Sequence, residues 1–545
     1  MKIFIRSLLL IQIFLLLNSN NLDAQTFTWV KTINSFHGDI FGKGTAIDTK
    51  GNSYITGYFQ DTAVFGTTNL MSRGIYDIYL AKYDHDGTCL WARQAGGSDW
   101  DQSYSISVDD NTNCYVTGYF TGTATFGQFQ ITSNGISDIF IAKYDPSGNC
   151  LWVKQAGGPS WDYGMHITVD AKGNSYLIGY FYEAATFGTF HLTSYGGSDI
   201  FIAKYDPDGN CLWAKQAGGT TDDWGYGISI DKNGNSYITG DFTGTATFGT
   251  IQLTSFESFN MFIAKYDADG NCLWVKQNSK PNGMNILVDA SGNIYVTGTF
   301  IGTATFGTIQ LSSYGDNDIY IAKYDSDGNC IWAKQAGGSS DDFSYGISID
   351  ANKNCYITGY FYGTVVFGAI QLDTYGGPDI FIAKYGPDGN CLWAKNAGSS
   401  YWDEGASIAI DTNGDCFITG HYCDGALFDK IQLSGYGAYI AKLSNSPVAI
   451  NDAINPIPTE YSLYQNYPNP YNPTCTINYS IVKEGNVKLT VYNSLGSKVV
   501  TLLNEYKPAG NYSVNFNAGD LPSGIYFYRL EAGQFSQVKK MMLMK

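Results

Sequence analysis

Five aspartates recur at one position of a repeating pattern, and they are the strongest candidates for ligand binding. Each stands five residues before an isoleucine inside a short apolar segment. If these segments are the innermost strands of a ring, the carboxylates approach the mouth of its channel and attract a cation or a polar ligand. The alternative, which the repetition favours, is that each aspartate caps its own turn by accepting backbone hydrogen bonds. The five residues are Asp101, Asp162, Asp223, Asp342 and Asp403.

Metal-ion and nucleophilic chemistry have weaker support. Segments such as Asp206-Pro207-Asp208-Gly209 suggest a calcium loop, but no distal glutamate follows, so they predict hairpin turns. The sequence has neither a serine in a G-x-S-x-G context nor a glycine-rich phosphate loop. We therefore expect no catalytic residue set, no metal site and no cofactor. The five histidines, which lack metal-ligand spacing, are His37, His85, His166, His191 and His421.

Two further repeating sets are better explained by packing. One lysine per repeat covers apolar surface with its stem. Four pairs of adjacent aromatic residues could stack on sugars if they were exposed, but packing between repeats is favoured. The lysines are Lys82, Lys143, Lys204, Lys265, Lys323, Lys384 and Lys442. The pairs are Tyr58-Phe59, Tyr119-Phe120, Tyr180-Phe181 and Tyr360-Phe361.

Catalysis would require a departure from the repetition, and the sequence has two. The fifth repeat is shortened around Asn278 to Gly283 and lacks its aspartate. The seventh carries His421, Cys423 and Asp424 where other repeats have Y-F-x-G. Sequence drift explains both departures as well, so the sequence favours a protein that is not an enzyme.

The elements that position these residues follow from the repeat itself. Seven tryptophans are spaced by 58 to 62 residues: Trp29, Trp91, Trp152, Trp213, Trp274, Trp332 and Trp393. Each repeat contains two predicted hairpins, with turns such as Asp231-Lys232-Asn233-Gly234-Asn235. Four strands per repeat and a period near 60 predict a β-propeller. The segment A-T-F-G-x-x-Q-L between the hairpins is expected to add a short strand or a packed loop.

The two ends of the repeat region complement each other. Thr26 to Lys31 form a lone fourth strand, and Tyr439 to Leu443 form a third strand without a successor. Joining them completes the last blade and removes two exposed sheet edges. We therefore predict an all-β fold over residues 25–446, a seven-bladed β-propeller closed by an N-terminal strand, followed by a small β-sandwich.

The repeats resemble a known family of β-propeller repeats, often labelled SBBP. The pattern that carries the resemblance is I-x-V-D-x-x-G-N-x-Y-V-T-G followed by A-K-x-D-x-x-G-x-x-L-W, and it extends over residues 25–446. The resemblance implies the propeller fold and an extracellular location, and it does not imply one activity.

The N-terminus and the overall charge indicate export. Lys2 and Arg6 precede a mostly apolar run, which predicts a signal peptide over residues 1–24 with cleavage between Ala24 and Gln25. An uncleaved anchor is the less favoured alternative, and no transmembrane segment is expected in the mature chain. The formal net charge of −17 argues against nucleic acid as a partner.

Most of the eleven cysteines occupy equivalent positions of successive repeats. Cys89, Cys150 and Cys211, for example, each precede a Leu-Trp pair. Equivalent positions lie a whole repeat apart, beyond the roughly 7 Å Cα separation that a disulfide can bridge. We therefore expect mostly free thiols that act as small apolar side chains.

After the repeats, residues 447–460 predict a linker and residues 461–545 a small antiparallel sandwich. This last module resembles the type A C-terminal sorting domain of the type IX secretion system. The motif residues that carry the resemblance include Pro468, Asn469, Pro470, Gly524, Lys539 and Lys540. The resemblance implies passage across the outer membrane with the type IX machinery as partner. An ordinary adhesion-type sandwich is the alternative.

Three functional hypotheses follow. The leading one is a monomeric, non-catalytic binding or scaffold protein, secreted or at the outer cell surface, that contacts a polysaccharide or a protein partner through one propeller face. The rival is a secreted propeller hydrolase or lyase that acts on polysaccharides, which requires an acid and a base on different blades at a suitable separation. The third is a structural surface component without a dedicated ligand.

Overall fold

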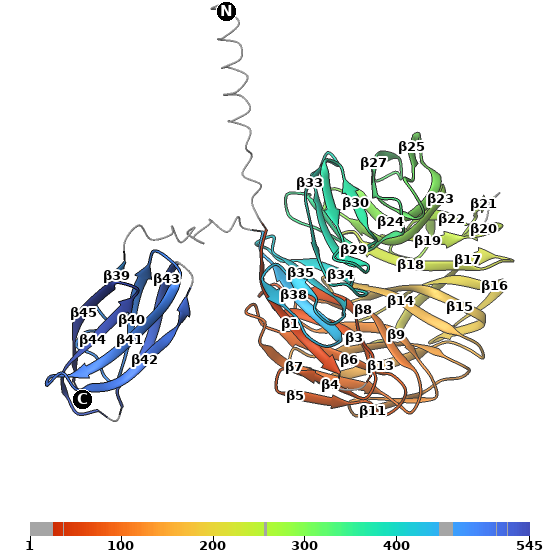
Figure 1. Ribbon diagram of the computed structural model, residues 1–545. Coiled ribbons are helices and arrows are strands. Elements are labelled where there is room, and N and C mark those ends of the chain that lie inside the picture. Colours follow the sequence, from red (N-terminus) through yellow and green to blue (C-terminus); the bar gives the residue numbers. More distant parts are fainter. Residues whose placement is uncertain are drawn as a thin grey trace, which may run out of the picture. The chain divides into compact units, whose positions relative to one another are not determined.

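The computed structural model describes residues 25–35, 38–255, 259–445, 461–507, 510–519 and 521–544, and the regular elements in these ranges are β-strands (Figure 1). The predicted signal peptide, Ala24 and the predicted linker lie outside the described residues. None of the described elements is a long apolar helix of the kind that crosses a membrane. The chain separates into two compact units, residues 1–446 and 447–545.

The first unit repeats one arrangement, a blade of four antiparallel strands joined by tight turns. Blade 1 contains β2 (Ile40–Ile47), β3 (Ser53–Phe59), β6 (Asp77–Tyr83) and β7 (Cys89–Gly96), from the innermost strand outward. The same order recurs along the chain, whose colours in Figure 1 pass from red through green to the blue of β35 (Cys416–Tyr422) and β38 (Gly437–Leu443).

The innermost strands of the later blades begin at or next to the aspartate position. They are β8 (Asp101–Val108), β14 (Asp162–Val169), β18 (Asp223–Ile230), the second half of β23 (Cys272–Val288), β28 (Asp342–Ile349) and β34 (Glu404–Ile410). The second strands are β9 (Cys114–Phe120), β15 (Ser175–Phe187), β19 (Ser236–Phe242), β24 (Ile294–Phe306), β29 (Cys355–Phe361) and β35 (Cys416–Tyr422).

The outer two strands of each blade follow. The third strands are β12 (Asp138–Tyr144), β16 (Phe190–Tyr205), β22 (Asn260–Tyr266), β26 (Asp318–Tyr324), β32 (Asp379–Tyr385) and β38 (Gly437–Leu443). The fourth strands are β13 (Cys150–Ala156), β17 (Cys211–Gly219), the first half of β23, β27 (Cys330–Gly337), β33 (Cys391–Ala397) and β1 (Phe27–Ser35).

The two ends of the repeat region meet in one sheet. β1 pairs antiparallel with β38, from Phe27 opposite Leu443 to Asn34 opposite Gly437. Each innermost strand packs against the innermost strand of the next blade, and β34 packs against β2. These contacts support the predicted seven-bladed closed ring with an N-terminal strand as its latch.

A second device ties neighbouring blades together through the main chain. The A-T-F-G segment forms a small hairpin, and its first strand pairs with the fourth strand of the preceding blade. Thus β4 (Thr62–Phe65) pairs with β1, and β10 (Thr123–Phe126) pairs with β7. The other hairpin strands are β5 (Thr68–Met71), β11 (Phe129–Thr132), β20 (Thr245–Phe248), β21 (Ile251–Thr254), β25 (Ile309–Ser312), β30 (Thr364–Phe367), β31 (Ile370–Asp373), β36 (Leu427–Phe428) and β37 (Ile431–Gln432).

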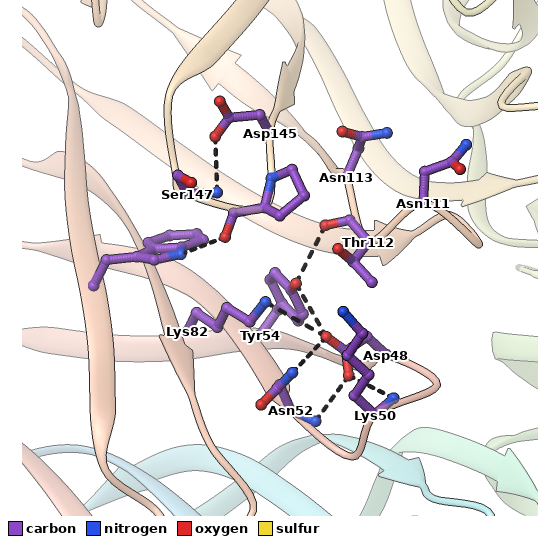
Figure 2. A network of polar contacts seen from close by, with 12 residues as sticks. Asp48, Lys50, Asn52, Tyr54, Lys82, Asn111, Thr112, Asn113, Asp145 and Ser147 are labelled. Atoms are coloured by element: carbon purple, nitrogen blue, oxygen red, sulfur yellow. Dashed lines mark hydrogen bonds and ion pairs between the residues drawn. The ribbon is translucent and has the colours of Figure 1, made fainter.

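The turns opposite the aspartate end of the blades form what we call the turn side. Here Asp48 accepts hydrogen bonds from the backbone N–H groups of Lys50 and Asn52, both at 2.9 Å. Lys82 Nζ lies 3.5 Å from Asp48 Oδ2 and 4.6 Å from the centre of the Tyr54 ring. Figure 2 shows Tyr54 reaching from this turn to Thr112 of the next blade, whose carbonyl accepts its hydroxyl at 3.2 Å.

The repeated tryptophans have a related role on the turn side. Trp91 Nε1 donates a hydrogen bond to the carbonyl of Pro146 in the next blade at 3.0 Å, and Trp152 does the same to Pro207. Trp29, Trp213 and Trp332 make equivalent bonds, so five of the repeated tryptophans link one blade to the next, whereas the buried Nε1 of Trp393 has no hydrogen-bond partner among the described residues. The cysteines are free in the structure, as their spacing predicts.

The second unit contains two antiparallel sheets around one apolar core. One sheet has the order β39-β40-β43 and the other β42-β41-β44-β45. Tyr471, Ile477, Leu489 and Tyr528, which are buried in the core between them, come from both sheets or from the loop before them. The strands are β39 (Ser462–Leu463), β40 (Thr474–Ile481), β41 (Gly485–Asn493), β42 (Lys498–Lys507), β43 (Gly510–Asn517), β44 (Gly524–Ala532) and β45 (Phe535–Leu543).

Candidate functional site

A cavity of about 290 Å³ lies at the centre of the propeller unit. Its lining residues come from the innermost strand of every blade: β2, β8, β14, β18, β23, β28 and β34. The blades of a propeller surround a central channel, and a cavity lined by both apolar and polar side chains is a common place for a small ligand to bind.

Each innermost strand has a β-bulge at the same place. In β8, for example, the pairing with β9 skips one residue between Ser103 and Ser105, so Tyr104 is left without a partner residue. A bulge re-aims a side chain, and bulges are enriched next to functional sites. All seven bulged residues line the cavity: Lys43, Tyr104, Met165, Tyr226, Met284, Tyr345 and Ala406.

The residue before each bulge is small because the neighbouring blade leaves no room for a larger one. A Cβ atom at Gly164 would collide with Thr117 Oγ1 of the preceding blade, and one at Gly405 would collide with Thr358 Oγ1. Where serine takes this place, its hydroxyl bonds to the same threonine, as between Ser344 and Thr297 at 2.8 Å. Contact with the neighbouring blade therefore restricts the residue before the bulge to glycine or serine. The bulged residue instead lines the cavity.

One ion pair stands in the cavity wall. Lys43 Nζ lies 3.0 Å from Glu404 Oε1, and the two side chains are 25% and 13% exposed. Burial opposes the charge of Lys43, but the Glu404 carboxylate and Tyr58 outweigh it, and the net effect raises the pKa of Lys43. The pair joins blade 1 to blade 7 and leaves the cavity wall without a net charge from these two residues.

Three tyrosines, Tyr104, Tyr226 and Tyr345, contribute aromatic rings to the cavity wall. Tyr104 contacts Tyr119 of the second strand at 5.9 Å between ring centres, and Tyr345 contacts Tyr360 at 5.9 Å. Burial raises the pKa of Tyr104, Tyr226 and Tyr345, so their phenol groups remain neutral hydrogen-bond donors and acceptors.

The polar residues that follow the bulges connect one blade to the next. Ser407 Oγ accepts from Thr45 N–H at 3.2 Å, and Ser105 Oγ accepts from Ile167 N–H at 3.2 Å. His166 Nδ1 lies 3.1 Å from the carbonyl oxygen of Ile228, and burial lowers the pKa of His166 to about 4. This histidine is therefore neutral, and its ring nitrogen has a structural partner.

The five predicted binding aspartates lie elsewhere. All are fully buried, and the residues that line the cavity do not include them. Asp101 accepts hydrogen bonds from the N–H groups of Gly97 at 2.7 Å and Thr121 at 3.3 Å. Asp403 accepts from Cys423 N–H and from Ser399 Oγ, both at 2.7 Å. These contacts favour the turn-capping alternative for the set.

Each of these aspartates has an acidic neighbour at the start of a third strand. A Cβ atom on Gly96 would lie 2.9 Å from Asp101 Oδ2 and 3.0 Å from Asp77 Oδ2, so both carboxyl groups surround the same glycine. Burial, together with this like charge, raises the pKa of Asp101 to about 7. Burial raises the pKa of Asp162, Asp223 and Asp342 to about 8 and that of Asp403 to about 6.

The two departures from the repeat have different surroundings. His421 stacks on Phe41 at 5.0 Å beside the cavity, and burial lowers its pKa. Asp424 instead accepts a hydrogen bond from Gly435 N–H in a surface turn. In blade 5, β23 runs on from the outer strand of blade 4 without the usual turn, and Asn278 in it is buried.

In the four Tyr-Phe pairs of the second strands, the phenylalanine belongs to the core and the tyrosine lies close to the cavity wall. Phe59, Phe120, Phe181 and Phe361 are fully buried, whereas the preceding tyrosines support the residues around the cavity. Tyr58, for example, lies 5.1 Å from Phe41.

The motif residues of the second unit cluster near its last strand. Asn469 Oδ1 accepts a hydrogen bond from Met542 N–H at 2.9 Å, and Pro468 and Pro470 flank it, each after a cis peptide bond. Gly524 begins β44, while Lys539 and Lys540 lie on β45.

Gln25, the residue after the predicted cleavage point, contacts the propeller unit. Its carbonyl oxygen accepts a hydrogen bond from Lys395 Nζ at 2.8 Å.

Comparison among the repeats could have located the cavity residues. The third residue after the aspartate is Tyr104 in blade 2 and Met165 in blade 3, whereas the residue before it is small in both blades. The bulge that turns this residue inward leaves no local signal, so the sequence analysis missed it.

Two curated proteins have partial sequence similarity. An uncharacterized WD repeat-containing protein, L264 of Acanthamoeba polyphaga mimivirus, is 26% identical in an alignment of 483 positions that covers 71% of this chain and 35% of that protein. The regulatory protein FlaEY of Caulobacter vibrioides is 23% identical over 226 residues, 39% of this chain and 22% of that protein. The chain therefore spans about a third or less of the length of these relatives.

The solved structures that were compared with this chain have low TM-scores. PorZ, a surface component of the type IX secretion system of Porphyromonas gingivalis, is 11% identical with a TM-score of 0.17, covering 92% of this chain and 81% of PorZ. An apocarotenoid oxygenase mutant of Synechocystis is 9% identical with a TM-score of 0.34, covering 77% and 95%. At these scores the likenesses carry no functional information.

Two protein families match defined parts of the sequence. Residues 90–122, 151–180, 212–241 and 331–360 match the family described as β-propeller repeat. Residues 465–544 match the family described as secretion system C-terminal sorting domain. The chain thus contains β-propeller repeats and a type IX secretion sorting domain, and this domain marks proteins that are exported to the cell surface or the extracellular space.

Proposed function

We propose that the propeller is a non-catalytic binding module whose ligand enters the central cavity, and that the sorting domain delivers it to the outside of the cell. The observation that carries this proposal is the contrast within each innermost strand. The residue before the bulge is glycine or serine, and the residue after it is glycine, serine, histidine or asparagine; both lie against the neighbouring blade. The bulged residue is lysine, tyrosine, methionine or alanine, and it lines the cavity.

The cavity wall suits a neutral ligand with both apolar and polar faces. Tyr104, Tyr226 and Tyr345 offer ring faces and hydroxyl groups, and two methionines provide adaptable apolar contacts. The only charges among the lining residues are Lys43 and Glu404, and these compensate each other. A strongly charged ligand would find no uncompensated partner in this wall.

Catalysis has less support from the same residues. Glu404 is engaged by Lys43, and the nearby carboxyl group of Asp241 is 3% exposed and accepts a hydrogen bond from Gly283 N–H at 3.0 Å. Burial raises the pKa of Asp241 to about 8. Neither group has the combination of exposure and free hydrogen-bonding capacity that a general acid or base requires.

The test is a binding screen of the full exported chain on a glycan array and against extracellular proteins of the same cells. Tyr226→Ala and Tyr345→Ala are expected to lower the affinity for the ligand about tenfold or more, since buried aromatic anchors dominate binding energy. Leu212→Ala, at an exposed position of an outer strand, serves as the matched control and leaves the affinity unchanged.

Two results would overturn the proposal. One is retention of the ligand by both tyrosine variants at wild-type affinity. The other is measurable turnover of a polysaccharide that Glu404→Gln abolishes, which would make the propeller an enzyme.

A further inference from the structure

Three tryptophans occupy the same repeat position and are left half-exposed. Trp100, Trp161 and Trp402 each stand directly before a capping aspartate, and they are 44%, 45% and 44% exposed. A large aromatic side chain is normally well buried, so repeated exposure at one position of the fold indicates a contact surface.

The three indole rings are held in place by the residues beneath them. Trp100 donates its backbone N–H to Thr121 Oγ1 at 2.8 Å and forms a bridge with Tyr76, whose ring lies 5.0 Å away. Tyr76 is itself anchored by its hydroxyl to Asp39 at 3.2 Å. A fixed ring loses little conformational entropy when a ligand lies on it.

The other two tryptophans also contact tyrosine rings, which come from other positions of the fold. Trp161 forms a bridge with Ser137 and meets the Tyr182 ring at 6.2 Å. Trp402 lies 5.1 Å from the Tyr360 ring.

The tryptophans are connected to the central cavity by continuous aromatic contacts. From Trp402 the path runs through Tyr360 to Tyr345 in the cavity wall, with a ring separation of 5.9 Å at the second step. From Trp100 it runs through Tyr76 to Tyr58 and then to Phe41 beside Lys43. Packed aromatic side chains therefore connect exposed rings to the cavity wall. We call the three exposed tryptophans, Trp100, Trp161 and Trp402, the tryptophan arc.

The other blades carry a charged residue at the position of these tryptophans. It is acidic in three of them, Asp39 in blade 1, Asp222 in blade 4 and Asp341 in blade 6, and basic in blade 5, where it is Lys280. Asp222 Oδ1 accepts from Ser198 N–H at 2.9 Å, and Asp341 Oδ1 accepts from Asn317 Nδ2 at 2.8 Å. With these acids on the same rim and a formal net charge of −17 for the chain, a polyanion would be repelled.

We propose that the tryptophan arc binds a neutral polysaccharide, whose sugar rings stack on the three indoles while one residue or chain end reaches the tyrosines of the cavity. This inference rests on the proposed binding function and names its ligand class. The C–H faces of pyranose rings complement indole faces, and the hydroxyl groups at their edges complement the phenols of the cavity. A neutral chain also avoids the charge repulsion that excludes acidic polymers.

The test is affinity electrophoresis of the full exported chain in native gels that contain laminarin, xyloglucan, dextran or the acidic polymer alginate. Wild type is expected to be retarded by at least one neutral polysaccharide and not by alginate. Each of Trp100→Ala, Trp161→Ala and Trp402→Ala is expected to weaken retardation roughly fivefold, and the triple variant to abolish it. Trp100→Phe, which keeps an aromatic face, retains most of the binding, and Leu212→Ala retains all of it.

The outcomes separate this inference from the proposed function. If the triple tryptophan variant binds like wild type while Tyr226→Ala does not, the arc is not the binding surface but the cavity is. If the tryptophan variants lose binding and Tyr226→Ala does not, the arc binds and the cavity has no role. Retardation of wild type by alginate alone, or by none of the neutral polymers, overturns the inference. Unfolding midpoints equal to that of wild type show that the variants are folded.

Discussion

Two regions of each blade, the turn side and the bulge at the cavity, differ in how strictly the same residue types recur from blade to blade. On the turn side, an aspartate, an asparagine and a lysine recur with the same hydrogen bonds: Asp48 with Asn52 and Lys82 in blade 1, and Asp350 with Asn354 and Lys384 in blade 6. At the cavity, the equivalent bulged residues of these two blades are Lys43 and Tyr345.

The difference shows where the fold demands a particular residue and where it does not. A buried aspartate beside a lysine must keep its partners, since an unpaired buried charge is costly. A bulged side chain that faces open space has no such constraint, so it is free to serve a ligand. Substitutions on the turn side should therefore cost more stability than substitutions at the bulged positions.

The largest loss of stability is expected on the turn side. Asp48→Ala removes the acceptor of two backbone N–H groups and leaves the buried Lys82 ammonium group without its partner. We expect the free energy of unfolding to fall by about 3 kcal/mol, measured by urea denaturation. Asp48→Asn, which keeps an acceptor oxygen, should lose less, and a loss below about 1 kcal/mol for the alanine variant would contradict the account.

A smaller loss is expected at the narrow point of the cavity wall. Gly164→Val places a side chain against Thr117 Oγ1 of the preceding blade and forces the two blades apart. Overpacking of this kind costs about 2 kcal/mol, which a shift in the urea midpoint would reveal. Thr117→Ala in the same chain should recover part of the loss; if it recovers none, the contact is not the cause.

The buried carboxyl groups predict a particular dependence of stability on pH. Burial raises the pKa of Asp162 to about 8, above its value in the unfolded chain, so the folded state prefers the protonated form. The contribution is fully present below the unfolded pKa, near pH 4, and is lost as pH rises through about 8. We expect the free energy of unfolding to fall by at least about 1 kcal/mol between pH 5 and pH 9, and Asp162→Asn to make this fall smaller without abolishing it, because other buried aspartates titrate in the same range. An identical pH profile in the variant would show that Asp162 does not titrate in this range.

The smallest effect is expected at a bulged position. Ala406 takes the place that methionine or tyrosine occupies in other blades, so Ala406→Met should change the free energy of unfolding by less than about 0.5 kcal/mol. Thermal unfolding of the variant beside wild type would measure this. A loss as large as that of Gly164→Val would mean that the cavity is part of the constrained framework.

The sequence predicts those features that local residue patterns determine. The turn at Asp48 to Asn52 and the strand ladders follow from turn chemistry and alternation. The bulge at Tyr104 could not be predicted, because it depends on how β8 pairs with β9 and packs between blades. The same holds for Asp101: its motif suggests a channel-mouth ligand as readily as a turn cap, and only the packing around Gly96 and Gly97 places it in the interior.

The most direct measurement is a crystal structure of the exported chain soaked with oligosaccharides of the polymer that retards it. The account predicts density for sugar rings against Tyr104, Tyr226 or Tyr345 in the cavity and against at least one of the exposed tryptophans. Density confined to the turn side, or to grooves between outer strands, would contradict the claim that the variable ends of the blades form the binding site.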